Sequence, residues 1–437
     1  TLSLHDALPI WVALEKLLNE TPPRLKAKII QAASPLHNQV MDILMEDNTI
    51  VSIAKQIDEA GAEKIISEKE LIFSPGWVDL MADYAEPGYE YKEGIKNGLV
   101  VAAKGGFTDV VIVPNTQPSI SNKAAVQFAL QQAQGAPAKL HVLGSISNNI
   151  EGKDLAEMLD MHEQGAVGFT DGWKPLQNAA LMLKALEYVK AFKGILVQIP
   201  MDSTIASNGL MHEGVHSTQL GMAGIPTIAE TILLQRDIDL LRYTQSRLHI
   251  SGVSCAASLA IIKQAKAAGL AITCDTTPYH LLFTDSALTS YNSLYKVMPP
   301  LRSEEDRQAL IAALKDGTID CIASHHRPQD WDAKQKEFEY ASYGMAVQEY
   351  SFAALYAEFE KELSIERWMD LFANNARCIF NLPYQIIQEG ASGNFSVVSL
   401  QHPNKLQIEN GQSKSNNMPF DTWSCNAKVI TTFISKN

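Results

Sequence analysis

Between residues 76 and 380 the chain alternates short apolar segments with longer segments of helical periodicity. Strands that alternate with helices along a chain form a parallel sheet with right-handed crossovers. Seven or eight such units in about 300 residues favour a closed (β/α)8 barrel over an open sheet. We therefore predict an α/β protein whose central domain, residues 76–380, is a (β/α)8 TIM barrel.

The expected elements of this barrel have residue ranges that the structure can test. In a barrel of this kind the functional residues follow the carboxyl ends of the strands. The predicted strands are 108–113, 140–143, 165–170, 194–199, 247–251, 271–274 and 320–323, and the predicted helices are 122–134, 178–192, 228–245, 256–268 and 304–314.

Both ends of the chain show the period of two that is typical of half-buried strands. Near the beginning, residues 26–30, 40–45 and 49–53 alternate in this way, and Asp47-Asn48 provides a turn between the last two. Near the end, residues 394–400 and 427–434 do the same. We predict a small β-sandwich domain built from residues 23–75 and 381–437.

Residues 1–22 do not fit this pattern. They contain no initiator Met, no basic n-region and no small-residue cleavage site, so they do not resemble a signal peptide. Their first ten residues resemble translated adapter sequence. We interpret 1–22 as an atypical segment foreign to the native protein, in which 11–18 is compatible with a short amphipathic helix.

Charge and cysteine content limit the partners and the compartment. A net charge of −13 and a pI near 5.3 argue against binding nucleic acid or an anionic membrane surface. No apolar run approaches the roughly 18–20 residues that span a bilayer. The 5 cysteines form no Cys-x-x-Cys pair, which indicates reduced thiols in a cytoplasmic protein. The 11 histidines are enough for a metal site, so composition alone does not exclude one.

Residues 74–88 have the outline of the first barrel strand of a metal-dependent amidohydrolase, Pro-Gly-x-x-Asp-Leu-His-x-His-x-Arg-Glu-Pro-Gly. Further blocks follow in the order expected for one family, and over residues 25–437 the chain resembles a dihydroorotase. The blocks that carry this resemblance are 86–93, 102–111, Val-Pro-Asn-Thr-Gln-Pro at 113–118, 220–230, Tyr-Lys-Val-Met-Pro-Pro-Leu-Arg at 295–302, and 418–434.

The resemblance implies reversible hydrolysis of the cyclic amide of dihydroorotate in pyrimidine biosynthesis. In the family, one or two Zn²⁺ ions polarise the carbonyl and activate a water, and an Asp moves the proton. A catalytic zinc needs about three protein ligands. In this chain the positions of the paired first-strand histidines are Met81 and Asp83, and two further ligand histidines are replaced by Gln198 and Gly252. Of the family's ligands, only the carboxylate Asp171 remains.

The residues that would act on the substrate have also changed. His325 stands where the family has its catalytic aspartate, and Ala85 replaces the arginine that would bind the substrate carboxylate. Asn115 and Arg302 remain and are our candidates for substrate binding. Loss of one charged hydrogen bond, about 1.5–3 kcal/mol, is enough to weaken binding by one to two orders of magnitude.

We therefore expect no catalytic residue and no metal, with Asp171 and His325 as vestigial positions. The predicted function is a catalytically inactive dihydroorotase homologue that assembles with aspartate carbamoyltransferase, as ligand-less chains of this family do. Because the family forms dimers or larger oligomers, we also expect a homo-oligomer.

Two alternatives stay open. The chain could be an active cyclic amidohydrolase whose rebuilt metal site uses Asp83, Asp171 and His325. It could also bind a regulatory ligand through Asn115 and Arg302.

Overall fold

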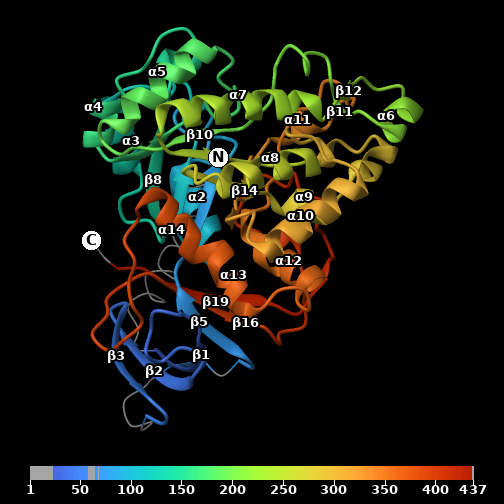
Figure 1. Ribbon diagram of the computed structural model, residues 1–437. Helices are drawn as coiled ribbons and strands as arrows, with labels where there is room; N and C mark the ends of the chain where they lie inside the picture. The colour runs from blue at the N-terminus through green and yellow to red at the C-terminus, as the bar shows by residue number, and fades with distance from the viewer. Residues whose placement is uncertain (1–22, 58–63, 67, 436–437) are drawn as a thin grey trace, which may run out of the picture.

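The computed structural model describes residues 23–57, 64–66 and 68–435. The atypical segment 1–22, with its predicted helix at 11–18, lies outside the described residues. Within them, the chain folds into a parallel barrel and a smaller β domain, which lies below the barrel in Figure 1.

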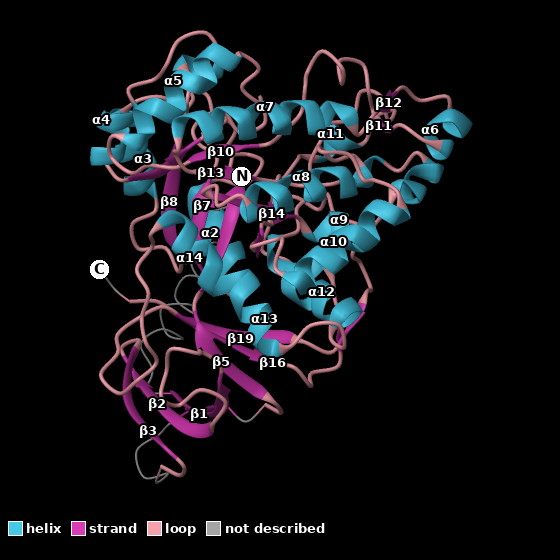
Figure 2. Cartoon of the chain, in the orientation of Figure 1, coloured by secondary structure: helices cyan, strands magenta, loops and turns pink. Residues whose placement is uncertain are grey.

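The barrel contains eight parallel strands that neighbour one another in the order of the sequence (Figure 2). This confirms the predicted α/β barrel, and each predicted strand is present with bounds within a few residues. The strands are β6 (Trp77–Ala82), β7 (Phe107–Ile112), β8 (Lys139–Gly144), β9 (Ala166–Phe169), β10 (Leu196–Gln198), β13 (Leu248–Ile250), β14 (Ile272–Thr276) and β15 (Cys321–Ile322).

The first and last strands meet through side chains. The carboxylate of Asp79, inside β6, accepts hydrogen bonds from the backbone and hydroxyl of Ser324 and from the amide of Gln348. The backbone N–H of Asp83 also donates to the carbonyl of His326, at 2.8 Å. These bonds close the barrel between β6 and β15.

Helices cover the outside of the barrel, and several begin at capping residues that the sequence displays. Asn122, Asn178 and Ser303 each accept a hydrogen bond from a backbone N–H of the first turn of their helix. The main helices are α2 (Ile95–Lys104), α3 (Lys123–Gln132), α4 (Met158–Glu163), α5 (Ala179–Lys190), α7 (Ile228–Thr244), α8 (Ala256–Ala267), α10 (Glu304–Asp316), α12 (Ser351–Phe359), α13 (Ile365–Met369) and α14 (Asn375–Phe380).

The two ends of the chain build one small sheet, as predicted; in Figure 1 the blue and red strands lie together. The strand order is β19-β16-β5-β1-β2-β3, with β4 beside β1. Its apolar core is separate from that of the barrel and includes Phe73, Phe395 and Phe433. The strands are β1 (Pro23–Ile29), β2 (Val40–Glu46), β3 (Thr49–Ala54), β4 (Lys64–Ile66), β5 (Leu71–Pro75), β16 (Phe395–Ser399) and β19 (Lys428–Phe433).

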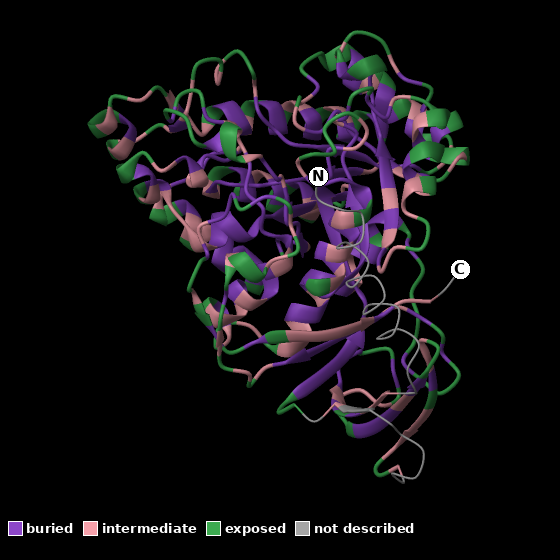
Figure 3. Cartoon of the chain, turned by 180° about the vertical axis from the view of Figure 1, so that it is seen from behind, coloured by how far each residue is buried: buried purple, intermediate pink, exposed green. Residues whose placement is uncertain are grey.

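Burial follows this architecture. The barrel strands are buried almost throughout, while exposed residues gather on the outer helices and loops (Figure 3). Trp77 at the start of β6 is fully buried and packs against the rings of Phe107, Phe352 and Phe372. In the part of the chain that the structure describes, no helix has both the length and the apolar character needed to cross a membrane.

Candidate functional site

The carboxyl ends of the barrel strands, which we call the mouth, contain an unusual set of backbone conformations. Met81, Ala85 and His325 have φ angles of 60°, 58° and 47°. Left-handed backbone is uncommon outside glycine and costs about 1–3 kcal/mol unless the surroundings impose it. Such strain is typical of functional sites, so the mouth is the candidate site.

Asp171 follows β9 and is buried among hydrogen-bond donors. Its carboxylate accepts from the backbone N–H groups of Ile146 and Ser147 and from the Ser147 hydroxyl. Burial raises the pKa of Asp171, although these donors act against the shift. The carboxylate therefore anchors the segment after β8 and does not face open space.

Asn115, a predicted substrate ligand, is also used internally. Its amide donates to the Asp171 carbonyl at 3.1 Å and accepts from the Trp173 backbone N–H at 3.2 Å. Gly172 allows this approach, because a Cβ at that position would lie 1.8 Å from the Asn115 side-chain oxygen.

Asp83 follows β6 and binds an aromatic side chain. One carboxylate oxygen accepts from the Ala85 backbone N–H at 3.0 Å, and the other accepts from the Trp173 indole N–H at 2.8 Å. The Arg327 guanidinium lies 3.8 Å from the same carboxylate and stacks on the indole, 4.7 Å from the ring centroid.

A buried hydrogen-bond network centres on Asp275 at the end of β14. The Asp275 carboxylate accepts from the Gly252 backbone N–H (2.7 Å), the Ser251 hydroxyl (2.7 Å) and His249 Nε2 (2.9 Å). Since Ser251 gives its proton to Asp275, its oxygen accepts from His325 Nε2 at 2.8 Å. This assigns the Nε2–H tautomer to His325 and leaves a lone pair on Nδ1.

His325 Nδ1 is buried and has no hydrogen-bond partner among the described residues. Burial lowers the pKa of His325 to about 4, with the Asp275 charge opposing the shift. The ring also fills the space beside Gly252, where a Cβ would lie 2.8 Å from His325 Cε1. The space beside Gly252 is therefore occupied by the imidazole of His325.

Met81 and Gln198, where the resemblance predicts replaced ligands, are both buried in the protein interior. Met81 is buried in an apolar cluster with Val78 and Val111. Gln198 accepts from the Leu176 backbone N–H at 3.2 Å and donates to Asp237, whose pKa burial raises to about 6. Neither side chain carries a charged group that could act as a ligand to a metal cation.

Arg302, the second predicted substrate ligand, is buried in a separate cluster. Its guanidinium forms an ion pair with Glu230 at 3.3 Å and donates to the Ser254 hydroxyl and the Ile225 carbonyl. Its side chain is 2% exposed. Arg302 therefore holds the loop before α10 in place.

These contacts allow a test of whether the mouth fits zinc. The described residues contain no group of three or more His, Cys, Asp or Glu side chains that could hold a metal ion. Asp83, Asp171 and His325 follow β6, β9 and β15, yet each binds its own protein partners, and the three form no such group. The donor set at the mouth does not fit the metal that the family uses.

Sequence reasoning missed three residues that organise the mouth: Asp275, Trp173 and Arg327. Asp275 and Trp173 do follow predicted strands, so their positions were a usable signal. Arg327 offered no such signal, because its place on the Trp173 ring depends on how the last loop folds.

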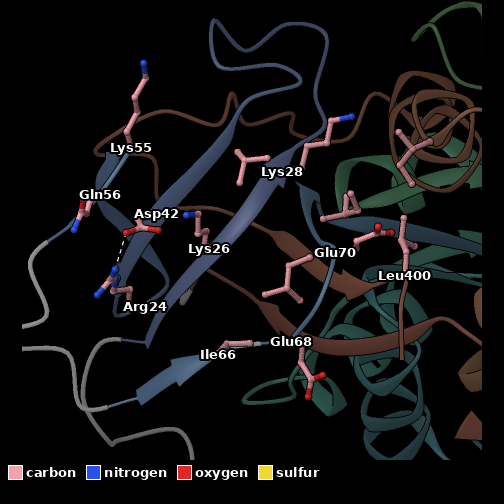
Figure 4. Close-up of a pocket in the computed structure, with 14 residues that line it drawn as sticks. Arg24, Lys26, Lys28, Asp42, Lys55, Gln56, Ile66, Glu68, Glu70 and Leu400 are labelled. Atoms are coloured by element: carbon pink, nitrogen blue, oxygen red, sulfur yellow. Dashed lines mark hydrogen bonds and ion pairs between the residues drawn. The ribbon is translucent and has the colours of Figure 1, made fainter. Parts of the chain in front are cut away.

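A groove lies on the outer face of the small sheet (Figure 4). This groove of about 980 Å³ is lined by Lys26, Lys28 and Lys55 and by Glu68 and Glu70. Its charges are mixed. We do not take it as the functional site.

The barrel and the small domain together form a fold that is found in solved structures. Two solved structures share the fold: L-hydantoinase from Arthrobacter aurescens (TM-score 0.82, 21% identity, 96% of each chain) and dihydropyrimidinase from Brevibacillus agri NCHU1002 (TM-score 0.78, 18% identity, 95% of this chain and 94% of the other).

Sequence comparison identifies the family. The family model described as dihydro-orotase-like matches residues 70–258. Dihydroorotase from Syntrophus aciditrophicus is 37% identical over 93% of this chain and 96% of its own length, and dihydroorotase from Acetivibrio thermocellus is 36% identical over 92% and 94%. The chain belongs to the dihydroorotase family.

Proposed function

We propose that this protein is a catalytically inactive member of the dihydroorotase family that acts in pyrimidine biosynthesis as an assembly partner of aspartate carbamoyltransferase. The inactive half of this proposal, the absence of catalysis, rests on the observation that side chains of the protein fill the mouth. Where zinc ligands would stand, His325 occupies the space beside Gly252, and Met81 and Gln198 are buried in contacts with their neighbours.

The chemistry of the reaction explains why these contacts matter. Hydrolysis of a cyclic amide at neutral pH needs an activated water and a group that takes up its proton. His325, at the position of the proton-transferring aspartate, is held by Ser251 and buried away from solvent. Asp171 is saturated by donors from the segment after β8. These side chains give the mouth neither the metal ligands nor a free general base.

The assembly half rests on the frame and on the family resemblance. The chain keeps all eight strands, the closure between β6 and β15 and the small domain, over nearly the full length of its relatives. A barrel that retains its shape without its chemistry can still provide protein surfaces. The partner named here comes from family members that lack metal ligands, and it is the first one to test.

The test has two parts. Purified protein, with and without added Zn²⁺, is analysed for bound metal by mass spectrometry and for dihydroorotate hydrolysis, with the Syntrophus aciditrophicus dihydroorotase as positive control. The protein is then co-expressed with aspartate carbamoyltransferase from the same organism and analysed by light scattering after gel filtration. We expect no stoichiometric zinc, no turnover and one joint complex. Zinc together with turnover overturns the inactive half, and two separate peaks overturn the assembly half.

A second candidate function is an active cyclic amidohydrolase with a rebuilt centre. It is favoured by the relatives named as dihydroorotases and by the left-handed backbone that persists at Met81, Ala85 and His325. It requires Asp83, Asp171 and His325 to move together. If wild-type protein turns over dihydroorotate and Asp83→Ala, Asp171→Ala and His325→Ala each abolish that activity, this candidate replaces the first.

A further inference from the structure

Trp173 contacts residues that follow three other barrel strands. Its indole N–H donates to Asp83 after β6, and its ring packs edge-on against His325 after β15, with centroids 5.4 Å apart. Arg327, from the same loop as His325, stacks on the indole. The Trp173 backbone N–H donates to Asn115 after β7. The side chain of one residue after β9 thus joins the ends of β6 and β15, and its backbone adds the end of β7.

We infer that Trp173 is a latch that closes the mouth of the barrel by side-chain contacts, at the place where shared metal ligands would otherwise tie the strand ends together. This inference rests on the inactive half of the proposed function, because it assumes that the mouth holds no zinc. It goes further by identifying what has replaced the metal as a cross-link.

The chemistry of the contacts suits this role. An indole provides a large apolar surface and a single N–H donor, so it can cover a site and still be fixed in orientation. A guanidinium over its ring adds a cation–π attraction of about 0.5–2 kcal/mol. Asp83 accepts the indole N–H with one oxygen and the Ala85 backbone N–H with the other. The latch therefore also supports the left-handed backbone at Ala85.

The latch also determines which buried polar atoms water can reach. His325 Nδ1 and Arg327 Nε are buried polar atoms without a hydrogen-bond partner among the described residues, and both side chains lie against the Trp173 ring. Such atoms bind water wherever water can enter. Displacing the indole would expose the His325 lone pair to solvent. His326, by contrast, lies at the β6–β15 closure, where it contacts Glu93 and Gln348.

Chemical modification of histidine measures this access directly. The full-length protein is treated with diethyl pyrocarbonate, and the modification of His325 and His326 is followed separately by tandem mass spectrometry. We compare wild type, Trp173→Ala and Trp173→Phe, with Trp331→Ala as matched control, because Trp331 is a tryptophan that is 71% exposed.

We expect Trp173→Ala to accelerate modification of His325 at least tenfold and to leave His326 slow. Trp173→Phe, which keeps a ring but loses the bond to Asp83, should give an intermediate rate, and Trp331→Ala should match wild type. If Trp173→Ala does not fold, Trp173→Phe and Asp83→Ala carry the test. A wild-type rate at His325 in folded Trp173 variants overturns the latch.

A chelator separates this inference from the proposed function. If the latch closes the mouth, His325 of wild type stays protected after treatment with EDTA. If zinc closes the mouth, EDTA exposes His325, and the latch is overturned. Zinc content and turnover, measured on the same wild-type sample, decide the proposed function independently.

Discussion

The two ends of the barrel contain buried polar clusters of opposite character. We call the amino ends of the strands the base. There, the carboxylate of Asp109 in β7 accepts hydrogen bonds from Arg377, from Asn394 and, at 2.9 Å, from His141. Burial acts to raise the pKa of Asp109, but Arg377 and His141 hold it well below its usual range. At the mouth, burial prevails: it raises the pKa of Asp171 and lowers that of His325.

The difference shows which cluster was built for stability. The base cluster pairs its buried charges and joins the barrel to the small domain through Asn394. The mouth cluster retains left-handed backbone at Met81, Ala85 and His325 and an unsatisfied nitrogen at His325. Barrels of this class place stability at the amino ends of the strands and chemistry at the carboxyl ends. This chain has left-handed backbone at the end of the barrel where such proteins place their chemistry.

The largest expected effect on stability comes from breaking the base cluster. Arg377→Met leaves the Asp109 carboxylate buried without its cationic partner, which should lower the free energy of unfolding by about 3–5 kcal/mol. Arg242→Met is the control: its ion pair with Asp239 is exposed, so we expect a change of at most about 0.5 kcal/mol. Urea denaturation measures both. Equal, small losses would show that the base is no more strongly held than the surface.

As the pH falls, the stability that His325 contributes at the mouth should be lost before the stability that Asp109 contributes at the base. A histidine whose pKa is about 4 when folded and about 6.5 when unfolded stabilises the fold at neutral pH, and this contribution is lost as the pH falls from 6.5 towards 4. Between pH 7 and pH 5 the loss from His325 amounts to about 2 kcal/mol. Asp109, with its lowered pKa, loses its contribution only below about pH 4.

His325→Asn tests this assignment, since Asn tolerates left-handed backbone. Denaturation of wild type and variant at pH 7 and pH 5 should show a smaller pH-dependent loss in the variant. His280, whose pKa burial lowers to about 3, contributes in the same direction and is present in both proteins. Identical losses would mean that His325 is not the group that titrates.

Two glycines with left-handed backbone allow a further test, in which the expected change in stability is smaller. Gly252 and Gly269 have φ angles of 71° and 77°, but a Cβ at Gly252 would press on His325 while a Cβ at Gly269 meets nothing within 4 Å. Gly269→Ala therefore measures backbone strain alone, and Gly252→Ala adds crowding. We expect Gly252→Ala to cost about 1–2 kcal/mol more in thermal denaturation, and the added variant His325→Ala to recover that difference. Equal costs for the two glycines would place the His325 ring elsewhere.

The smallest expected effect is on the amount of zinc that the protein binds. Met81→His combined with Asp83→His restores the first-strand pair, yet we expect substoichiometric zinc by mass spectrometry, because Gln198 and Gly252 still contribute no ligand. Adding Gln198→His and Gly252→His together with His325→Asp should raise the zinc content. Stoichiometric zinc in the double variant would show that the mouth is more adaptable than its contacts indicate.

Much of the fold was predictable from local pattern. Strand and helix ranges followed from periodicity, with bounds within a few residues of those observed. The closure between β6 and β15 was not predictable, because the Asp79–Ser324 bond joins residues 245 positions apart. Asn115 and Arg302 were named from the family resemblance as candidates for substrate binding, and that role stays a prediction; their protein-internal partners could not be known from the sequence.

The sequence by itself determined which side chains stand at the strand ends, since residue identity is a property of the chain and needs no coordinates. Only the tertiary structure decided what those side chains contact. His325 reaches Ser251 across 74 positions and Trp173 reaches Asp83 across 90, so these partnerships exist only once the strand ends are brought together. The sequence alone predicted that the strand ends lack metal ligands, and only the packing of the folded chain decided which partners Met81, Gln198 and His325 have.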